Sequence, residues 1–313
     1  MKMDIIMTDT LQPHLEQSHF HSPEVLMKMN NLESTEFSLF LPAYNEGLRT
    51  EEGGSPGDPF RDALETYSEE LYKKYGRRHQ FFVVDDGSTD NGETSRIARE
   101  HGVQVVNNPN GKTSIRGGAY KVGYEHAHGE VIGSADADLS YSFKTISAMA
   151  DKVESGEYRV AIAYRDGESD HPSLVRKVGH TGMHLFCEYF APTGVRDPQA
   201  GAKVFHKDAA ALLWPQVESD EWAADREVML LARLYGLDVY EQAAFIQARG
   251  GSTVDLLLDP LRMARDAIRM GVNVGLEDKR IRKNLGKLIL PAADNIVDLA
   301  EYMNKKNEGR KVT

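Results

Sequence analysis

Short apolar runs that end in acidic and small residues constrain the fold of this chain more than any other feature of its sequence. The run 81–84 leads into Asp85-Asp86-Gly-Ser-Thr-Asp90, and the run 131–134 leads into Ala-Asp136-Ala-Asp138. Segments with helical spacing separate such runs. This alternation predicts an α/β domain with a mostly parallel central sheet and helices on both faces. Ligands of such sheets bind beyond the carboxyl ends of the strands, so both acidic clusters are expected at one edge.

The apolar periodicity also predicts the individual elements. Strands are expected at 37–41, 80–84, 103–106, 131–134, 159–163, 202–205 and 239–248. Helices are expected at 60–75, 89–101, 114–128, 143–155, 174–190, 222–235, 260–272 and, with an interruption at Pro291, 279–303. Residues 49–59 are rich in glycine and proline and are expected to form a flexible insertion.

Length and composition indicate a globular protein with three parts. The chain has 313 residues, of which 41% are hydrophobic and 27% charged. We expect a polar N-terminal arm (1–35), one large α/β domain (36–255) and a C-terminal helical segment (256–313). A single cysteine, Cys187, excludes an internal disulfide, and the first residues lack the pattern of a secretory signal. A cytoplasmic location is therefore expected.

The charge balance limits the partners. A formal net charge of −11 disfavours non-specific nucleic-acid binding, and an anionic small ligand would need a cation and local basic residues. The C-terminal segment is locally basic and amphipathic. It is interpreted either as a helix packed on the core with a solvated face, or as a peripheral contact with the cytoplasmic side of a membrane. The oligomeric state is left open.

Asp136 and Asp138 are the candidate metal ligands. Residues i and i+2 of an extended segment point to the same side, so both carboxylates can converge on one ion. Mg²⁺ or Mn²⁺ prefers oxygen ligands and accepts one or two carboxylates, with a diphosphate and water completing the shell. A solvated turn or helix cap is the alternative for an Asp-x-Asp sequence.

Two further segments provide candidate nucleotide contacts. A carboxylate of Asp85 or Asp86 can accept hydrogen bonds from a nucleobase or ribose, although a βα loop with a capping Asp90 is the alternative. Lys112 and Arg116 flank an expected helix start, where cations and backbone N–H groups favour a diphosphate. Surface ion pairs are the alternative for these two cations.

Taken together, these ordered motifs resemble the family 2 glycosyltransferases of GT-A fold, most closely the dolichyl-phosphate mannosyl- and glucosyltransferase branch. The resemblance spans residues 37 to 270. It rests on seven segments: Pro42-Ala-Tyr-Asn-Glu46, Val83 to Asp90, Gly111-Lys112 with Arg116, Asp136-Ala-Asp138-Leu-Ser, Ala161 to Arg165, Asp197-Pro-Gln-Ala-Gly201 with Lys203-Val-Phe205, and Trp222 to Glu227.

The resemblance implies a role for each matching position and an inverting, metal-dependent transfer of a hexose from a UDP- or GDP-sugar to a polyprenyl phosphate. The nucleotide-sugar contacts would be Pro42, Ala43, Tyr44, Glu46, Asp85, Asp86, Lys112, Arg116 and Asp136. Asp136 and Asp138 would hold Mg²⁺ or Mn²⁺. Arg165 and Arg176 would face the acceptor phosphate, and Asp197 and Gln199 would lie beside the sugar. If the acceptor is an alcohol, Asp197 and then Asp225 are the candidate general bases.

The sequence departs from the family pattern at two places. Ser140 stands where many members carry a glutamine as a further metal ligand, and Ala200-Gly-Ala202 replaces the usual small-Gly-Phe. Because Ser140 departs from the pattern, binding of a nucleotide sugar without catalysis stays open. Transfer to a soluble hydroxyl acceptor also stays open, because no segment of the sequence is expected to span a membrane. A nucleotidyltransferase is disfavoured because the first strand lacks a glycine-rich basic loop.

Overall fold

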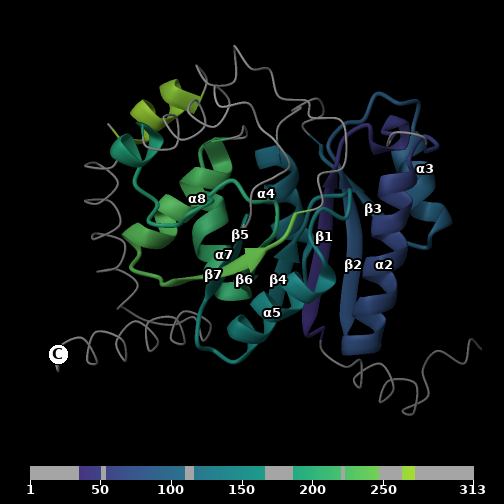
Figure 1. Ribbon diagram of the computed structural model, residues 1–313, viewed down its shortest axis with the longest axis horizontal. Helices are drawn as coiled ribbons and strands as arrows, with labels where there is room; N and C mark the ends of the chain where they lie inside the picture. The colour runs from purple at the N-terminus through teal and green to yellow at the C-terminus, as the bar shows by residue number, and fades with distance from the viewer. Residues whose placement is uncertain are drawn as a thin grey trace, which may run out of the picture. The chain divides into compact units, whose positions relative to one another are not determined.

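The computed structural model describes residues 35–50, 54–109, 116–165, 186–219, 223–246 and 263–271. Within these ranges the chain forms a seven-stranded sheet with helices packed against it (Figure 1). The strands are β1 (Phe37–Ala43), β2 (His79–Asp85), β3 (Gln104–Asn107), β4 (Val131–Ser134), β5 (Val160–Arg165), β6 (Lys203–His206) and β7 (Val239–Ala244). The helices are α2 (Asp58–Tyr75), α3 (Glu93–Glu100), α4 (Arg116–His126), α5 (Phe143–Glu154), α7 (Lys207–Leu213) and α8 (Ala223–Leu234). Two short 3-10 helices, η2 (Glu46–Leu48) and η3 (Trp214–Gln216), complete the list, and residues 186–190 and 263–271 are also helical.

The strand order is β3-β2-β1-β4-β6-β5-β7. Strands β1 to β4 run parallel to one another, β6 runs antiparallel to both β4 and β5, and β7 runs parallel to β5. All strands except β6 therefore point the same way, which confirms the predicted mostly parallel α/β sheet. The order in which strands are added to the sheet reverses between β1 and β4, and doubly wound sheets bind ligands at such a reversal.

Aromatic side chains of β1 show how the two faces of the sheet are covered. Phe37 stacks on Tyr75 of α2, with ring centroids 5.1 Å apart. Phe40 packs edge-on against Tyr120 and Tyr124 of α4, with centroids 5.9 and 5.0 Å apart. Positions 37 and 40 of a strand face opposite sides, so α2 and α4 cover opposite faces. Apolar side chains of β1 therefore pack against helices on both faces of the sheet.

Helix boundaries differ from the prediction at two places that border the site. Helix α3 begins at Glu93 rather than at residue 89, because Asn91 and Gly92 adopt left-handed backbone conformations, with φ of 56° and 82°. Helix α2 begins at Asp58, with Pro59 in its first turn, where proline is favoured. Residues 58 and 59 of the expected flexible insertion therefore belong to a helix. Residues 207–213 form α7, which was not predicted.

Several predictions fall outside the described residues. These are the N-terminal arm up to residue 34, the domain boundary at 255, the helix 279–303 and most of the helix 174–190. The division into an arm, a domain and a C-terminal segment stays a prediction. Among the described helices, none is both long and apolar enough to span a bilayer.

Candidate active site

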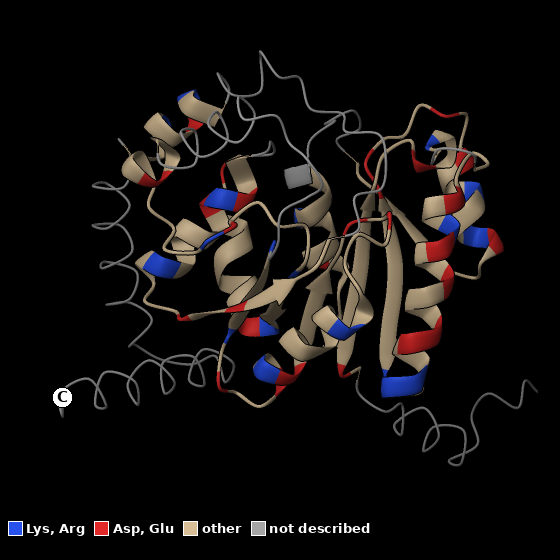
Figure 2. Cartoon of the chain, in the orientation of Figure 1, with Lys and Arg blue, Asp and Glu red and all other residues tan. Residues whose placement is uncertain are grey.

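The carboxyl ends of the parallel strands bring the acidic segments to one edge of the sheet. Ala43, Asp85 and Ser134 end the neighbouring strands β1, β2 and β4, and β1 lies between the other two. Strand β5 ends at the same edge with Arg165, and the reversed strand β6 begins there at Lys203. Figure 2 shows acidic residues in the loops that follow these strands. The two acidic clusters that the sequence singled out therefore share one edge, as expected.

Asp138 is the most tightly held carboxylate of this edge. Its side chain is only 8% exposed, and its Oδ2 accepts a 2.8 Å hydrogen bond from Nη2 of Arg49. Its Oδ1 accepts hydrogen bonds from both the backbone N–H and the hydroxyl of Ser140. Leu139 between them adopts a left-handed backbone conformation, with φ of 56°, which turns the chain back on itself. Ser140 therefore orients Asp138, whatever else its hydroxyl does.

Glu46 extends this acidic cluster across to β1. Arg49 Nη1 lies 3.4 Å from the Glu46 carboxylate, so one guanidinium joins Glu46 and Asp138. Burial raises the pKa of the Glu46 carboxyl from 4.5 to about 7, Arg49 opposes this rise, and Asp138 and Asp136 add to it. Negative charge is thus crowded here, and Arg49 only partly neutralises it.

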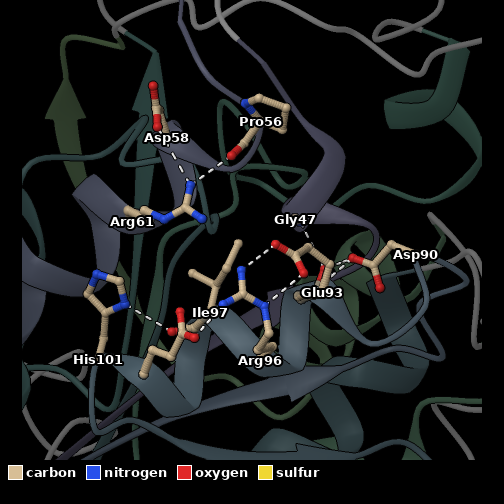
Figure 3. Close-up of polar contacts among 11 residues, drawn as sticks. Gly47, Pro56, Asp58, Arg61, Asp90, Glu93, Arg96, Ile97 and His101 are labelled. Carbon is tan, nitrogen blue, oxygen red and sulfur yellow. Dashed lines mark hydrogen bonds and ion pairs between the residues drawn. The ribbon is translucent and has the colours of Figure 1, made fainter.

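The turn that carries Glu46 and Arg49 is fixed against α3. The Gly47 N–H donates a 3.0 Å hydrogen bond to the Thr94 hydroxyl, and Asp90 accepts from both the backbone N–H and the hydroxyl of Thr94. A Cβ on Gly47 would lie 2.6 Å from Cγ of Glu93, so a residue with a side chain would push the turn away from the helix (Figure 3). The N-cap of α3 is Gly92 and not, as the sequence suggested, Asp90, but Asp90 still bonds to the first turn of the helix through Thr94.

Asp136 lies against the loop that precedes β6. A Cβ added to Gly201 would lie 2.3 Å from the Asp136 carboxylate, so only a glycine allows this approach. The Gly201 N–H donates a 3.1 Å hydrogen bond to the Tyr141 hydroxyl. Burial raises the pKa of this hydroxyl, and the negative charges of Asp136 and Asp197 raise it further. The charges of Asp136 and of the 197–201 loop therefore act on the same hydroxyl, that of Tyr141.

Asp85 and Asp86 differ in their environments. Asp85 is 7% exposed and accepts a 2.8 Å hydrogen bond from the Ser88 N–H and a 2.7 Å hydrogen bond from the Ser95 hydroxyl, so it shapes its own loop. Asp86 is 4% exposed and accepts a 2.6 Å hydrogen bond from the Asn108 side-chain amide. Both carboxylates are therefore buried and hydrogen-bonded at the end of β2.

The Pro42-Ala-Tyr segment forms the end of β1 and the start of its loop. The Ala43 carbonyl accepts a 2.9 Å hydrogen bond from the Asp86 N–H, which ties this segment to the Asp85-Asp86 turn. Pro42 pairs with Val84 in the sheet register. Tyr44 is 39% exposed, an unusual environment for an aromatic ring next to a buried strand. Its ring is thus available to a planar ligand.

Arg165 and Asp197 form an ion pair on the other side of β4. Arg165 donates from Nε to Asp197 Oδ2 at 2.8 Å and from Nη2 to Oδ1 at 3.3 Å, in the bidentate arrangement that arginine and carboxylate favour. Gln199 is half-buried two residues further along the same loop. Arg176 and Lys112 lie outside the described residues, and Arg116 begins α4 without a described side chain.

Asp225, the second candidate base, is a buried partner of Lys203. Its Oδ1 lies 2.8 Å from the Lys203 ammonium, and the two side chains are 2% and 0% exposed. Helix α8 is largely buried, and the neighbouring Arg226 pairs with Glu188. An ion-paired carboxylate without solvent access is a poor general base.

The cluster suits a hard divalent cation. Among the described residues no group of three or more His, Cys, Asp or Glu side chains converges on a single point. Asp136 and Asp138 nevertheless supply the oxygen ligands that Mg²⁺ and Mn²⁺ prefer, and a diphosphate and water can supply the others. Burial is the main cause of the raised pKa of Glu46, and the charges of Asp138 and Asp136 add to it. The oxygen donors of these side chains are therefore compatible with the expected metal, which Asp136 and Asp138 would hold.

Three contributing residues escaped the sequence reasoning. Arg49 was assigned to a flexible insertion, although its spacing of three residues from Glu46 places both in one tight turn. Gly201 was noted only as part of a motif, and its steric role depends on Asp136, which lies in the loop after β4 and is far from it in the sequence. Lys203 had a visible signal, since a single lysine within an apolar strand needs a buried partner.

The arrangement defines a class of protein: an α/β protein whose acidic side chains gather at the carboxyl edge of a mostly parallel sheet. Comparison with known proteins then identifies the family. The sequence profile described as "Glycosyl transferase family 2" matches residues 38–213. The chain belongs to glycosyltransferase family 2 and is a glycosyltransferase.

Its relatives point to one branch of that family. The chain is 26% identical over 266 residues to a dolichyl-phosphate beta-glucosyltransferase of Dictyostelium discoideum, covering 82% of this chain and 79% of the relative. It is also 26% identical to the human protein of the same description, covering 82% and 83% of the two chains. The predicted closeness to the dolichyl-phosphate sugar transferase branch is thus confirmed.

Solved structures confirm the GT-A-like α/β fold. A glucosyl-3-phosphoglycerate synthase from Mycobacterium tuberculosis, in complex with Mn²⁺, UDP-glucose and phosphoglyceric acid, superimposes with a TM-score of 0.57. The match covers 76% of this chain and 79% of the synthase, at 17% sequence identity. At this identity the similarity concerns the fold.

Proposed function

We propose that this glycosyltransferase transfers glucose from UDP-glucose to the phosphate of a dolichyl-type polyprenyl phosphate, with inversion at the anomeric carbon and with Mg²⁺ or Mn²⁺ bound. The observation that carries the proposal is the meeting, at one sheet edge, of the Asp136–Asp138 segment with the Arg165–Asp197 pair. The descriptions of two relatives support the choice of sugar and acceptor, and a structural neighbour that binds UDP-glucose and Mn²⁺ supports the donor and metal.

The donor would be held at the β1 and β2 ends. Tyr44 offers an exposed ring to the base, and Asp86 offers a carboxylate to the nucleoside. A divalent cation held by Asp136 and Asp138 would neutralise charge on the departing nucleoside diphosphate. Lys112 and Arg116, on the segment leading into α4, are proposed to add positive charge to the same leaving group.

The acceptor would approach from the β5 side. A phosphate acceptor is already anionic, so it needs a cation rather than a general base. Arg165 would supply one, exchanging part of its bidentate contact with Asp197 for the acceptor phosphate, and Arg176 is proposed to supply a second. Asp197 and Gln199 would then lie beside the sugar. Asp197 would serve as the base only if the acceptor were an alcohol.

The test uses the full chain with UDP-glucose, MnCl₂ and either a short polyprenyl phosphate or the matching polyprenol. We expect glucosyl transfer to the phosphate alone, loss of transfer with EDTA, and a fall of about 100-fold or more in Asp138→Asn. Asp151→Asn, an exposed aspartate on α5, is the matched control and should retain full activity. Transfer to polyprenol alone, or full activity of Asp138→Asn, would contradict the proposal.

A further inference from the structure

A fully buried lysine lies beneath the loop that carries Asp197 and Gln199. The Lys203 side chain is 0% exposed. Its ammonium group donates to Asp225 Oδ1 at 2.8 Å and to the backbone carbonyl of Ala200, and it lies 5.3 Å from the centroid of the Tyr120 ring. A carboxylate, a carbonyl and an aromatic face thus surround one charge.

Two tyrosines hold the next residue of the same loop. The Tyr120 hydroxyl donates to the Gly201 carbonyl at 3.1 Å, and the Tyr141 hydroxyl accepts from the Gly201 N–H at 3.1 Å. Both polar groups of the Gly201 backbone are therefore bonded to side chains from other elements, α4 and the segment after β4. Together with Lys203, these contacts fix two consecutive residues of the loop from below.

The position of this loop matters for the candidate active site at both of its ends. At one end Asp197 pairs with Arg165, and at the other Gly201 lies directly against the Asp136 carboxylate. A small displacement of the loop would move the acceptor-side ion pair away from the metal-side carboxylate. Holding the loop by a buried ion pair costs free energy of folding, because both ions lose their hydration. Packed apolar side chains would fill the same space at lower cost but would give the Ala200 carbonyl no donor.

We propose that Lys203 is a positioning residue for glycosyl transfer: with Asp225, Tyr120 and Tyr141 it fixes the loop 197–202, and so sets Asp197 relative to Asp136. It touches no substrate and acts through the Ala200 carbonyl. Its catalytic consequence rests on the proposed function, whereas its effect on the loop does not.

The experiment compares the wild-type chain with Lys203→Met and with the double variant Lys203→Met/Asp225→Asn. The single variant leaves the Asp225 carboxylate buried without its cation, so its melting temperature should fall sharply. The double variant removes both charges and should recover most of that loss. The matched control is Lys207→Met/Glu130→Gln, which removes an exposed ion pair at the opposite end of β6.

Two measurements are made on the folded double variant. Hydrogen exchange of the 197–202 peptide should quicken by about tenfold or more without any substrate, because Ala200 and its neighbours lose their anchor. In the transfer assay kcat should fall about tenfold or more, while KM for UDP-glucose changes less than about threefold, since the donor contacts on β1 and β2 are untouched. The control should match the wild type in both measurements.

The outcomes separate this inference from the proposed function. A stable double variant with wild-type exchange over 197–202 overturns the positioning role, even if the enzyme proves to use another acceptor. Quickened exchange with wild-type kcat overturns its catalytic part. A wild-type chain that transfers nothing to polyprenyl phosphate contradicts the proposed function alone, and the exchange measurement still decides the role of Lys203.

Discussion

At the scale of single residues, the site depends on charges that are held close together before any ligand binds. Arg49 joins Glu46 to Asp138, Ser140 orients Asp138, and Gly201 lets Asp136 lie against the backbone. Ser140, which stands where many family members carry a glutamine, donates its hydroxyl to the Asp138 carboxylate. Orientation of Asp138 is thus built into the motif itself.

Glu46 should make folding depend on pH. Its pKa is raised by burial to about 7, so between pH 4.5 and 7 the folded state binds more protons than the unfolded state, and stability falls as pH rises through this range. The loss reaches at most about 3 kcal/mol. Urea unfolding in EDTA at pH 5 and pH 8 should show this loss, and Glu46→Gln should reduce it. Glu125→Gln, exposed on α4, should leave the pH dependence of the wild type intact.

Gly201→Ala should weaken metal and donor binding. Its Cβ would lie 2.3 Å from the Asp136 carboxylate, so either the loop or the carboxylate must move. We expect Mn²⁺ affinity in the presence of UDP, measured by calorimetry, to fall about tenfold, and stability to fall by about 1–3 kcal/mol. Gly123→Ala is a matched control with the same 2.3 Å overlap, against the ring of Phe40 in the core. It should lose stability but bind as the wild type does; equal binding by both variants would refute the role of Gly201.

At the scale of elements, the site is assembled where turns are tied to helices. The turn η2 has no cap from its own side chains and instead bonds to Thr94 of α3. Strand β6, reversed relative to its neighbours, lets the 197–202 loop enter the sheet at the active edge. Helix α8 contributes Asp225 from below. Each element thus positions a residue of another.

Thr94→Val should loosen η2 while keeping the shape of the side chain. The change removes the acceptor of the Gly47 N–H and one donor to Asp90. Hydrogen bonds to a buried charged group are worth about 1.5–3 kcal/mol, so urea unfolding should show a loss of that order. Donor affinity should fall with it, because Glu46 and Arg49 lie on the same turn. Thr145→Val near the exposed start of α5 should change neither quantity by more than about 0.5 kcal/mol.

At the scale of the whole described domain, the candidate site residues lie at one edge of the sheet, and the opposite edge consists of turns that carry none of them. The carboxyl edge holds Glu46, Asp86, Asp138 and Arg165, whereas the opposite edge holds turns such as 76–78 and 101–103. The aromatic core between the edges, including Tyr120, Tyr124 and Trp214, supports the site from one face.

Ligand binding should therefore protect one edge only. UDP-glucose with Mn²⁺ should slow hydrogen exchange in peptides covering 43–49, 85–90, 135–140 and 197–202. Exchange at 76–79, 101–104 and 128–131 should stay unchanged. EDTA should remove most of the protection. Uniform protection of both edges would show that the ligand acts on global stability and not at the proposed site.

The sequence by itself determined the α/β class, the approximate position of each strand and the acidic motifs, because apolar periodicity and residue type are local properties. It placed Asp136 and Asp138 at the right edge for the same reason. Tertiary structure alone decided that Arg49 joins Glu46 to Asp138, that Asp225 is the partner of Lys203, and that β6 runs in reverse. The two charge contacts depend on a backbone turn or join residues that are far apart in the chain, and they form because a buried charge needs a partner. The direction of β6 depends likewise on which strands it pairs with in the folded sheet.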